Sequence, residues 1–145
     1  LAFCNTKVQC RDLVAVLQAQ GFSALALYGE LEQRERDQVL IQFANRSCSV
    51  LVATDVAARG IDIDDVAAVV HYEPPMDVKT YLHRSGRTAR AGRDGWAVTL
   101  AEYNQHTTCR IIQRGLRLEP QPPIEVFSND KRLANLASFV TPTIA

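Results

Sequence analysis

The sequence predicts a single α/β domain built on a mostly parallel β-sheet. Short apolar runs, each as long as a buried strand, alternate along the chain with amphipathic segments of helical periodicity. Strands that are apolar at every position are typical of a parallel sheet that helices cover on both faces. The chain has 145 residues, of which 47% are hydrophobic and 22% charged, as expected for one globular domain.

Five apolar runs are expected to form the strands of this sheet. They are residues Leu1–Phe3, Ala24–Leu27, Ser49–Ala53, Ala67–Tyr72 and Ala97–Leu100. Ligands of such sheets gather at the carboxyl ends of the strands. Polar residues that directly follow these runs are therefore the candidates for a functional site.

Four amphipathic segments between and after these strands predict helices. Thr6 is a suitable N-cap for the first helix, and Gly21 is a suitable residue to end it. Asp77 can cap the third helix, because Pro74 and Pro75 force a loop just before it. The four segments are residues 7–20, Gln33–Phe43, 78–84 and Asn104–Leu116.

The pattern changes near residue 118, so we expect a domain over 1–118 and a tail over 119–145. The tail has three prolines near its start, and Asn129 or Asp130 can cap a last helix over Lys131–Val140. It is either an extension docked on the domain or the start of a linker to another domain. The chain does not begin with Met, so we expect a fragment whose N-terminal edge is truncated.

The charge balance argues against a general polyanion binder. The 16 basic residues are matched by 16 acidic ones, whereas a protein that binds nucleic acid by charge alone carries a basic excess. Only three of the basic residues are Lys. The planar guanidinium of Arg matches phosphate oxygens and keeps its charge. The composition therefore indicates specific phosphate contacts rather than a diffuse basic face.

The cysteines and the apolar runs limit other functions. The four cysteines form no C-x-x-C pair, so no metal site is expected. Their positions in apolar segments indicate buried thiols in a reducing compartment, and we expect a cytoplasmic protein. No apolar run approaches the roughly 18 residues of a membrane helix, so no membrane contact is expected.

Four arginines recur at every third residue after the fourth strand. They are Arg84, Arg87, Arg90 and Arg93. On a helix this spacing places neighbours on one face, where the cations repel one another unless an anion lies between them. A solvated basic face is the ordinary interpretation. However, compensating Glu residues are missing, and Gly86 allows close backbone approach, which favours a bound phosphate.

A second cluster, Ala53–Asp62, directly follows the third strand. A turn of small residues after a strand exposes N–H groups that can bind phosphate oxygens. Thr54 adds a hydroxyl, and Asp62 can accept hydrogen bonds from ribose hydroxyls. An ordinary tight connection explains the spacing equally well. The charged stretch Gln33–Asp37 and the pair at residues 5 and 6 are most simply a first helical turn and a cap.

In this order, these segments resemble the motifs of the C-terminal lobe of the DEAD-box RNA helicases, over about residues 1–118. The run His83–Arg90 matches motif VI, H-R-x-G-R-x-x-R, and Ala53–Asp62 matches motif V. Gln33–Arg36 matches the Q-x-x-R motif, and Leu1–Thr6 matches the end of motif IV. The resemblance implies a RecA-like three-layer α/β/α fold and ATP-dependent RNA unwinding. His83 stands where the DEAH-box and RecQ-like helicases usually carry Gln, which favours RNA over DNA.

The resemblance also implies roles for individual residues. Arg87 and Arg90 would reach the γ-phosphate of ATP, with Arg90 as the arginine finger. Asp62 would contact the ribose, and His83 would help to couple nucleotide to RNA. Arg84 would brace the motifs internally. The residues implied in RNA backbone contact are Asn5, Thr6, Gln33, Arg36, Thr54, Arg59 and Gly60.

The phosphate loop G-x-x-x-x-G-K-[ST] and the Asp-Glu-Ala-Asp quartet are missing from the sequence. ATP and Mg are therefore expected mainly on an N-terminal RecA-like lobe of the same protein, which with RNA is an expected partner. We expect this fragment alone to be inactive. Residues 29–37 resemble the bacterial DEAD-box protein A branch, which carries an RNA-binding domain after the helicase core. A noncatalytic protein-docking module and a DNA helicase lobe are the alternatives.

Overall fold

The structure is a computed structural model that describes residues 1–89, 92–119 and 122–139. Within these residues, five strands form one sheet in the order β2-β3-β1-β4-β5, and every neighbouring pair is parallel. The strands are β1 (Ala2–Cys4), β2 (Ala24–Leu27), β3 (Val50–Thr54), β4 (Ala68–His71) and β5 (Trp96–Thr99). The predicted parallel α/β sheet is confirmed, and each predicted strand is present within two residues of its expected ends.

The helices follow the predicted order, with one addition. They are α1 (Lys7–Ala19), α2 (Gln33–Ala44), α3 (Asp55–Ala58), α4 (Val78–Ser85) and α5 (His106–Gly115). Both predicted caps form: the Thr6 side chain accepts a hydrogen bond from the amide of Gln9, and the Asp77 side chain accepts one from the amide of Thr80. A 3-10 turn, η1 (Tyr103–Gln105), precedes α5 where we expected continuous helix.

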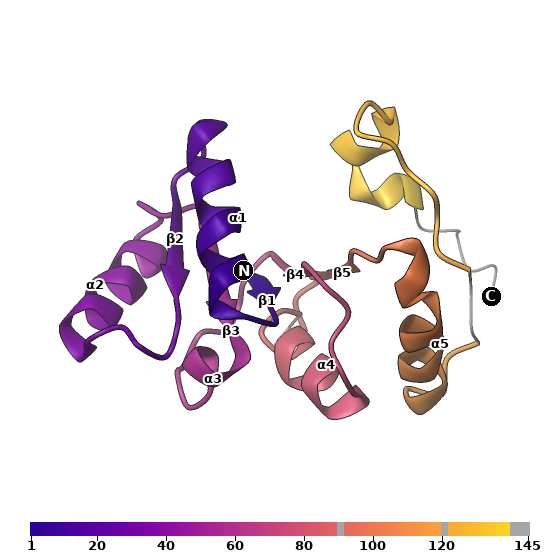
Figure 1. Ribbon diagram of the computed structural model, residues 1–145, viewed down its shortest axis with the longest axis horizontal. Coiled ribbons are helices and arrows are strands. Elements are labelled where there is room, and N and C mark those ends of the chain that lie inside the picture. The colour runs from indigo at the N-terminus through magenta and orange to yellow at the C-terminus, as the bar shows by residue number, and fades with distance from the viewer. Residues whose placement is uncertain (90–91, 120–121, 140–145) are drawn as a thin grey trace.

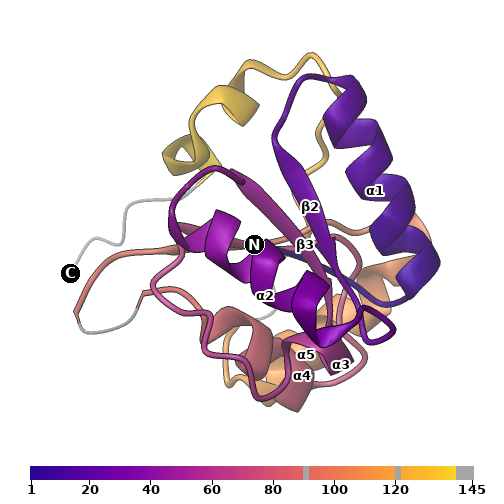
Figure 2. The same cartoon turned by 90° about the vertical axis from the view of Figure 1, so that its left-hand side faces the viewer.

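The order of the strands places the first two helices on opposite faces. The chain crosses the sheet in one direction from β1 to β2 and returns from β2 to β3. Right-handed connections in opposite directions require helices on opposite faces, and α1 and α2 lie on either side of β2 and β3 (Figures 1 and 2). The sheet is therefore the middle layer of three.

Alternate residues of β1 supply the two halves of the core, because successive side chains of a strand point to opposite faces. Leu1 and Phe3 pack with the partly buried side chains of α2 on one face. Ala2 and Cys4 pack with α1 on the other face. Cys10 and Cys48 are also buried, as predicted, whereas Cys109 is only half-buried; all four cysteines are free thiols.

The expectation of a turn directly after β3 is wrong. Residues 55–58 form the one-turn helix α3, which begins immediately after Thr54. Thr54 has extended backbone, and Asp55 lies in the first turn, where a carboxylate is favourable next to the helix dipole. Gly60 then turns the chain with φ +74°, a conformation that glycine adopts without strain.

The expectation of four arginines on one helical face is also wrong. Helix α4 ends at Ser85, and Gly86 is its C-cap, with its amide bonded to the carbonyl of Leu82 at 2.9 Å. Beyond this point Thr88 pairs with Val66 in an isolated parallel bridge, so the chain leaves the helix axis. This bridge is the physical reason for the change of direction, because Gly86 itself has an ordinary φ of −66°. Arg90 lies outside the described residues.

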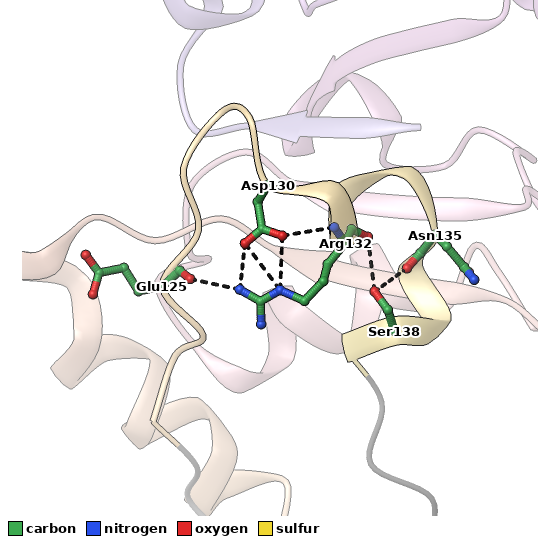
Figure 3. A network of polar contacts seen from close by, with 5 residues as sticks. All are labelled: Glu125, Asp130, Arg132, Asn135 and Ser138. Carbon is green, nitrogen blue, oxygen red and sulfur yellow. Dashed lines mark hydrogen bonds and ion pairs between the residues drawn. The ribbon is translucent and has the colours of Figure 1, made fainter.

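The tail contains two short 3-10 turns instead of the single predicted helix. They are η2 (Lys131–Ala134) and η3 (Leu136–Phe139), and Asp130 caps the first, as predicted. Asn135 separates them, because its extended backbone and its side-chain bond to the amide of Ala137 compete with helical hydrogen bonds. Figure 3 shows the carboxylate of Asp130 against the guanidinium of Arg132, which also bonds the carbonyl of Glu125. The predicted end of the helix, at residue 140, lies outside the described residues.

None of the helices in the described part of the chain is both long and apolar enough to cross a membrane.

Candidate functional site

A cavity of about 460 Å³ lies where two of the predicted clusters meet. Its walls come from residues within 55–61, which follow β3, and within 80–87, which form α4 and its exit, together with Phe3 of β1. The sequence predicted these two clusters separately. The parallel sheet brings them together, because β3, β1 and β4 are neighbours and end at the same edge.

The buried guanidinium of Arg84 joins the ends of these three strands. Its Nε and Nη2 each donate to the carboxylate of Asp55 at 2.7 Å, just after β3. Nη2 also donates to the side-chain oxygen of Asn5 at 2.8 Å, after β1. Nη1 donates to the carbonyl of Glu73 at 3.3 Å, after β4, and the ring of Phe3 lies 5.3 Å away. We call Arg84 with Asp55, Asn5 and Glu73 the Arg84 node.

The Arg84 node is a structural brace, as the resemblance implied. The Arg84 side chain is 1% exposed, so its charge must be paired within the protein. The bidentate contact with Asp55 provides that pairing in the strongest geometry available to a guanidinium. Arg84 is consequently not free to bind an anion.

Arg87 lines the same cavity but has different partners. Its Nη1 donates to the carbonyls of Ile61 at 2.6 Å and Ile63 at 3.3 Å, and its Nη2 donates to the carbonyl of Ala58 at 3.0 Å. Among the described residues, no carboxylate forms an ion pair with Arg87. Carbonyl dipoles orient a guanidinium without cancelling its charge. The cavity therefore keeps a half-buried cation on its wall.

Residues that were predicted to contact nucleotide or RNA are distributed around this cation. His83 is exposed and lines the cavity from α4. Arg59 and Gly60 are exposed and line the opposite side. Asp62 is also exposed, but it lies on the following loop and is not among the residues that line the cavity. Arg93 lies outside the cavity too and pairs with Asp65 at the surface.

Three of the predicted RNA residues meet at the carboxyl edge of the sheet. Asn5 and Thr6 follow β1, and Thr54 ends β3 opposite Cys4 in the parallel register. Each already has a local environment: Asn5 bonds Arg84 and Glu73, Thr6 caps α1, and Thr54 is 9% exposed. Asn5 and Thr6 are nevertheless exposed, so a ligand at this edge can reach them, whereas Thr54 is buried.

The Q-x-x-R residues lie at the start of α2. The side chain of Gln33 donates to Asp37 at 2.8 Å, within the same helix. Arg36 donates from Nη2 to the carbonyl of Gly29 at 2.6 Å. Its Nε is buried and has no hydrogen-bond partner among the described residues. Arg36 therefore braces the loop before α2 and retains an unused donor.

Sequence reasoning missed His71, the last residue of β4. The side chain is fully buried, its Nε2 lies 3.1 Å from the Ser85 hydroxyl, and its ring stacks on Tyr81 with centroids 4.8 Å apart. Burial, assisted by the nearby positive charge of Arg84 and opposed by Asp55, lowers the pKa of His71 to about 4. The ring is therefore neutral at pH 7. No local signal in the sequence links His71 to Ser85, which lies 14 residues further along the chain.

Asp55 and Glu73, two partners of Arg84 in the node, were also missed by sequence reasoning. Asp55 directly follows β3 and Glu73 lies two residues after β4, at the edge where this fold gathers functional groups. Only the strand order shows that both lie beside Arg84. Elsewhere, no three His, Cys, Asp or Glu side chains of the described residues are grouped so that they could hold a metal ion.

Comparison with known proteins identifies the family. The model of the helicase conserved C-terminal domain matches residues 1–92. The Escherichia coli DEAD-box protein SrmB, solved in complex with regulator of ribonuclease activity A, is 37% identical; the match covers 86% of this chain and 80% of that one, with a TM-score of 0.75. This chain belongs to the DEAD-box family. It is the C-terminal helicase domain, and the predicted RecA-like fold is confirmed.

Two further relatives bear on what the DEAD-box domain does. The ATP-dependent RNA helicase DbpA of Escherichia coli is 47% identical over 119 residues, which are 82% of this chain and 26% of DbpA. Dbp5 of Saccharomyces cerevisiae, solved with RNA and ADP BeF3, is 37% identical with a TM-score of 0.71; the match covers 78% of this chain and 31% of Dbp5. The chain spans about a quarter of the length of the curated relatives it matches.

Proposed function

We propose that this DEAD-box domain is the second lobe of an ATP-dependent RNA helicase and supplies positive charge to the γ-phosphate of ATP held by the first lobe. The observation that carries this proposal is Arg87, a half-buried cation on the cavity wall with no carboxylate partner among the described residues. An arginine that stabilises charge on a transferring phosphoryl group can accelerate the reaction by roughly 10³ to 10⁵.

The proposed roles follow the motifs residue by residue. Arg87 and Arg90 contact the γ-phosphate, and Arg90 acts as the arginine finger. Asp62 contacts the ribose from its exposed loop, and His83 couples nucleotide to RNA from the rim of the cavity. The chain contributes cations and hydrogen-bond groups only, and the first lobe holds ATP and Mg. The names of DbpA and of the Dbp5 complex support ATP and RNA as the ligands.

RNA binds along the carboxyl edge of the sheet in this proposal. The backbone contacts come from Asn5, Thr6, Gln33, Arg36, Thr54, Arg59 and Gly60. The amino end of α2 adds unpaired N–H groups and a favourable dipole for a phosphate. Contacts of this kind position a strand without reading its bases, so little sequence preference is expected. They also require few Lys residues, in keeping with the zero net charge.

The subfamily and the cellular setting are a further part of the proposal. The resemblance of residues 29–37 to the DEAD-box protein A branch, together with the identity to DbpA, favours that branch. We therefore propose a cytoplasmic protein in which residues 119–145 lead to a C-terminal RNA-binding domain.

The direct test replaces Arg87 and Arg90 singly by Ala in the full-length protein. RNA-stimulated ATP hydrolysis is expected to fall by about 10³-fold or more in each variant, because transition-state charge loses its partner. RNA binding is expected to stay within a few-fold of wild type. The matched control is Arg93→Ala, which removes an exposed arginine of the same run and is expected to leave hydrolysis unchanged. Normal hydrolysis in both Arg87→Ala and Arg90→Ala would reject the proposal.

Two simpler measurements test its other parts. The isolated chain is expected to show no RNA-stimulated ATP hydrolysis, because the first lobe is proposed to hold ATP and Mg. Measurable turnover by the isolated chain would contradict that part of the proposal. RNA is expected to stimulate the full-length protein and to outcompete DNA of the same length. Equal stimulation by DNA would favour a DNA helicase lobe.

One observation favours a second role as a docking surface for proteins. The related SrmB domain was solved in complex with regulator of ribonuclease activity A. If docking is the sole role, Arg87→Ala and Arg90→Ala leave hydrolysis by the full-length protein intact, which separates this alternative from the first.

A further inference from the structure

Helix α4 carries His83 and Arg84 and leads directly into Arg87, so its placement decides the geometry of the cavity. It contacts α5 at its first residue, where the Val78 side chain lies against Gly115. Its largest aliphatic side chain, Leu82, is 52% exposed, and its only buried residue is the charged Arg84. A helix held in this way depends on directional polar contacts for its rotation and height above the sheet.

Two such contacts hold α4. The first is the Arg84 node. The second is His71 at the end of β4, which contacts α4 through Tyr81 and Ser85. Tyr81 and Ser85 are four residues apart and therefore lie one above the other on the same face of α4. The Tyr81 ring lies flat on the imidazole, with an interplanar angle of 10°. The 3.1 Å contact between Nε2 and the Ser85 hydroxyl restricts movement of α4 parallel to the two rings.

We propose that His71 is a positioning residue for motif VI: its imidazole fixes the rotation of α4 so that Arg84 reaches Asp55 and Arg87 faces the cavity. The inference rests on the proposed function, because the consequence of misplacing α4 is lost ATP hydrolysis. His71 touches neither nucleotide nor RNA in this scheme.

The surroundings of the ring support positioning rather than simple core filling. The other ring nitrogen, Nδ1, is buried and has no hydrogen-bond partner among the described residues. An aliphatic side chain would fill the same space without leaving a polar atom unmet. The ring is also neutral, because burial and the facing Arg84 disfavour protonation more than the facing Asp55 favours it. The contact at Nε2 is the feature that an aliphatic residue could not reproduce.

The test is a double-mutant cycle in the full-length protein. His71→Phe keeps a ring to stack on Tyr81 but removes the Nε2 contact, and Ser85→Ala removes the other partner. Each is expected to lower kcat for RNA-stimulated ATP hydrolysis by about 5- to 20-fold, because small displacements of catalytic groups are costly. KM for ATP and for RNA is expected to stay within about twofold. The double variant is expected to be no slower than either single variant, because both remove the same contact.

Tyr81→Phe is the matched control, because it keeps the stacked ring and alters only the hydroxyl; it is expected to retain wild-type kcat. Amide hydrogen exchange of the same variants is the second measurement. Residues 81–88 are expected to exchange faster in His71→Phe and Ser85→Ala, with the other segments unchanged.

The outcomes are distinguishable. Unchanged kcat, multiplicative losses in the double variant, or faster exchange spread evenly over the domain would each overturn the positioning role. A wild-type protein without RNA-stimulated hydrolysis would refute the proposed function instead. In that case the exchange of residues 81–88 still decides whether His71 positions α4.

Discussion

Arg84 and Arg87 lie three residues apart in one motif, but the structure gives them opposite environments. Arg84 is 1% exposed and forms a bidentate pair with Asp55. Arg87 is half-buried and is held by the main-chain carbonyls of Ala58, Ile61 and Ile63. One guanidinium is neutralised by a carboxylate, and the other is only oriented by dipoles.

This difference in pairing is the reason why we interpret Arg84 as structural and propose Arg87 as the arginine that meets an anion. A buried cation with its own counter-ion stabilises the native arrangement, because removing either partner leaves an unpaired charge. A cation held by carbonyls on a cavity wall retains attraction for an anion, and it is already oriented when the anion arrives. The Arg84 node ties α4 to the ends of three strands, and Arg87 follows directly after that helix on the cavity wall.

The largest expected effect comes from breaking the Arg84 node. Arg84→Ala should lower the free energy of unfolding by about 3 kcal/mol, the lower end of the range for broken buried pairs, because the Asp55 side chain is 34% exposed. Urea denaturation followed by circular dichroism measures this. Arg93→Ala, which breaks the exposed pair with Asp65, should cost at most about 1 kcal/mol. Equal losses in the two variants would show that burial of Arg84 adds no stability.

A change of pH probes the same region through His71. The folded-state pKa of about 4 lies below the ordinary value of 6.5, so the unfolded chain binds more protons between these values. Stability should therefore fall as the pH decreases, by about 2 kcal/mol between pH 7.5 and pH 5. Urea midpoints across this range measure the effect. In His71→Phe the decrease in stability over the same range should be smaller by about 2 kcal/mol. An identical slope in His71→Phe would contradict the assignment.

Removal of Arg87 should cost little stability, in contrast to Arg84. Arg87→Ala deletes hydrogen bonds to three carbonyls that border a cavity, where water can replace the guanidinium, so about 1 kcal/mol is expected. The same urea experiment compares it directly with Arg84→Ala. A loss as large as that of Arg84→Ala would make Arg87 a structural residue and weaken the proposed catalytic role.

The smallest effect is expected in the tail, where a third arginine also forms a close carboxylate pair. Arg132 pairs with Asp130, but both are solvent-accessible, and the hydrogen bonds from Arg132 lower the pKa of Asp130 (Figure 3). Arg132→Ala should leave the urea midpoint of the domain unchanged and accelerate amide exchange only within residues 130–138. A shifted midpoint would indicate that the tail stabilises the domain.

Local patterns predicted much of this architecture correctly. The apolar runs, the caps at Thr6 and Asp77 and the stop near Gly21 depend on interactions within a few residues, which the sequence displays directly. The rule that parallel sheets gather ligands at their carboxyl ends also indicated the segment after β3, which forms one wall of the cavity. The same local reasoning failed at Asn135 in the tail, where a side-chain hydrogen bond competes with the helix.

The residues missed by sequence reasoning act over long separations. Arg84 lies 29 residues from Asp55 and 79 from Asn5, and His71 lies 14 from Ser85. No periodicity connects such pairs. They become neighbours only because the sheet places β1 between β3 and β4.

By itself, the sequence determined the order of the elements, the parallel sheet and the presence of arginines at its functional edge, because periodicity, capping and turn chemistry are local. The tertiary structure alone decided which arginine is buried, which one faces the cavity and which histidine supports them. The energy of a charge depends on its burial and on its partner, and both are defined only when distant strands come together.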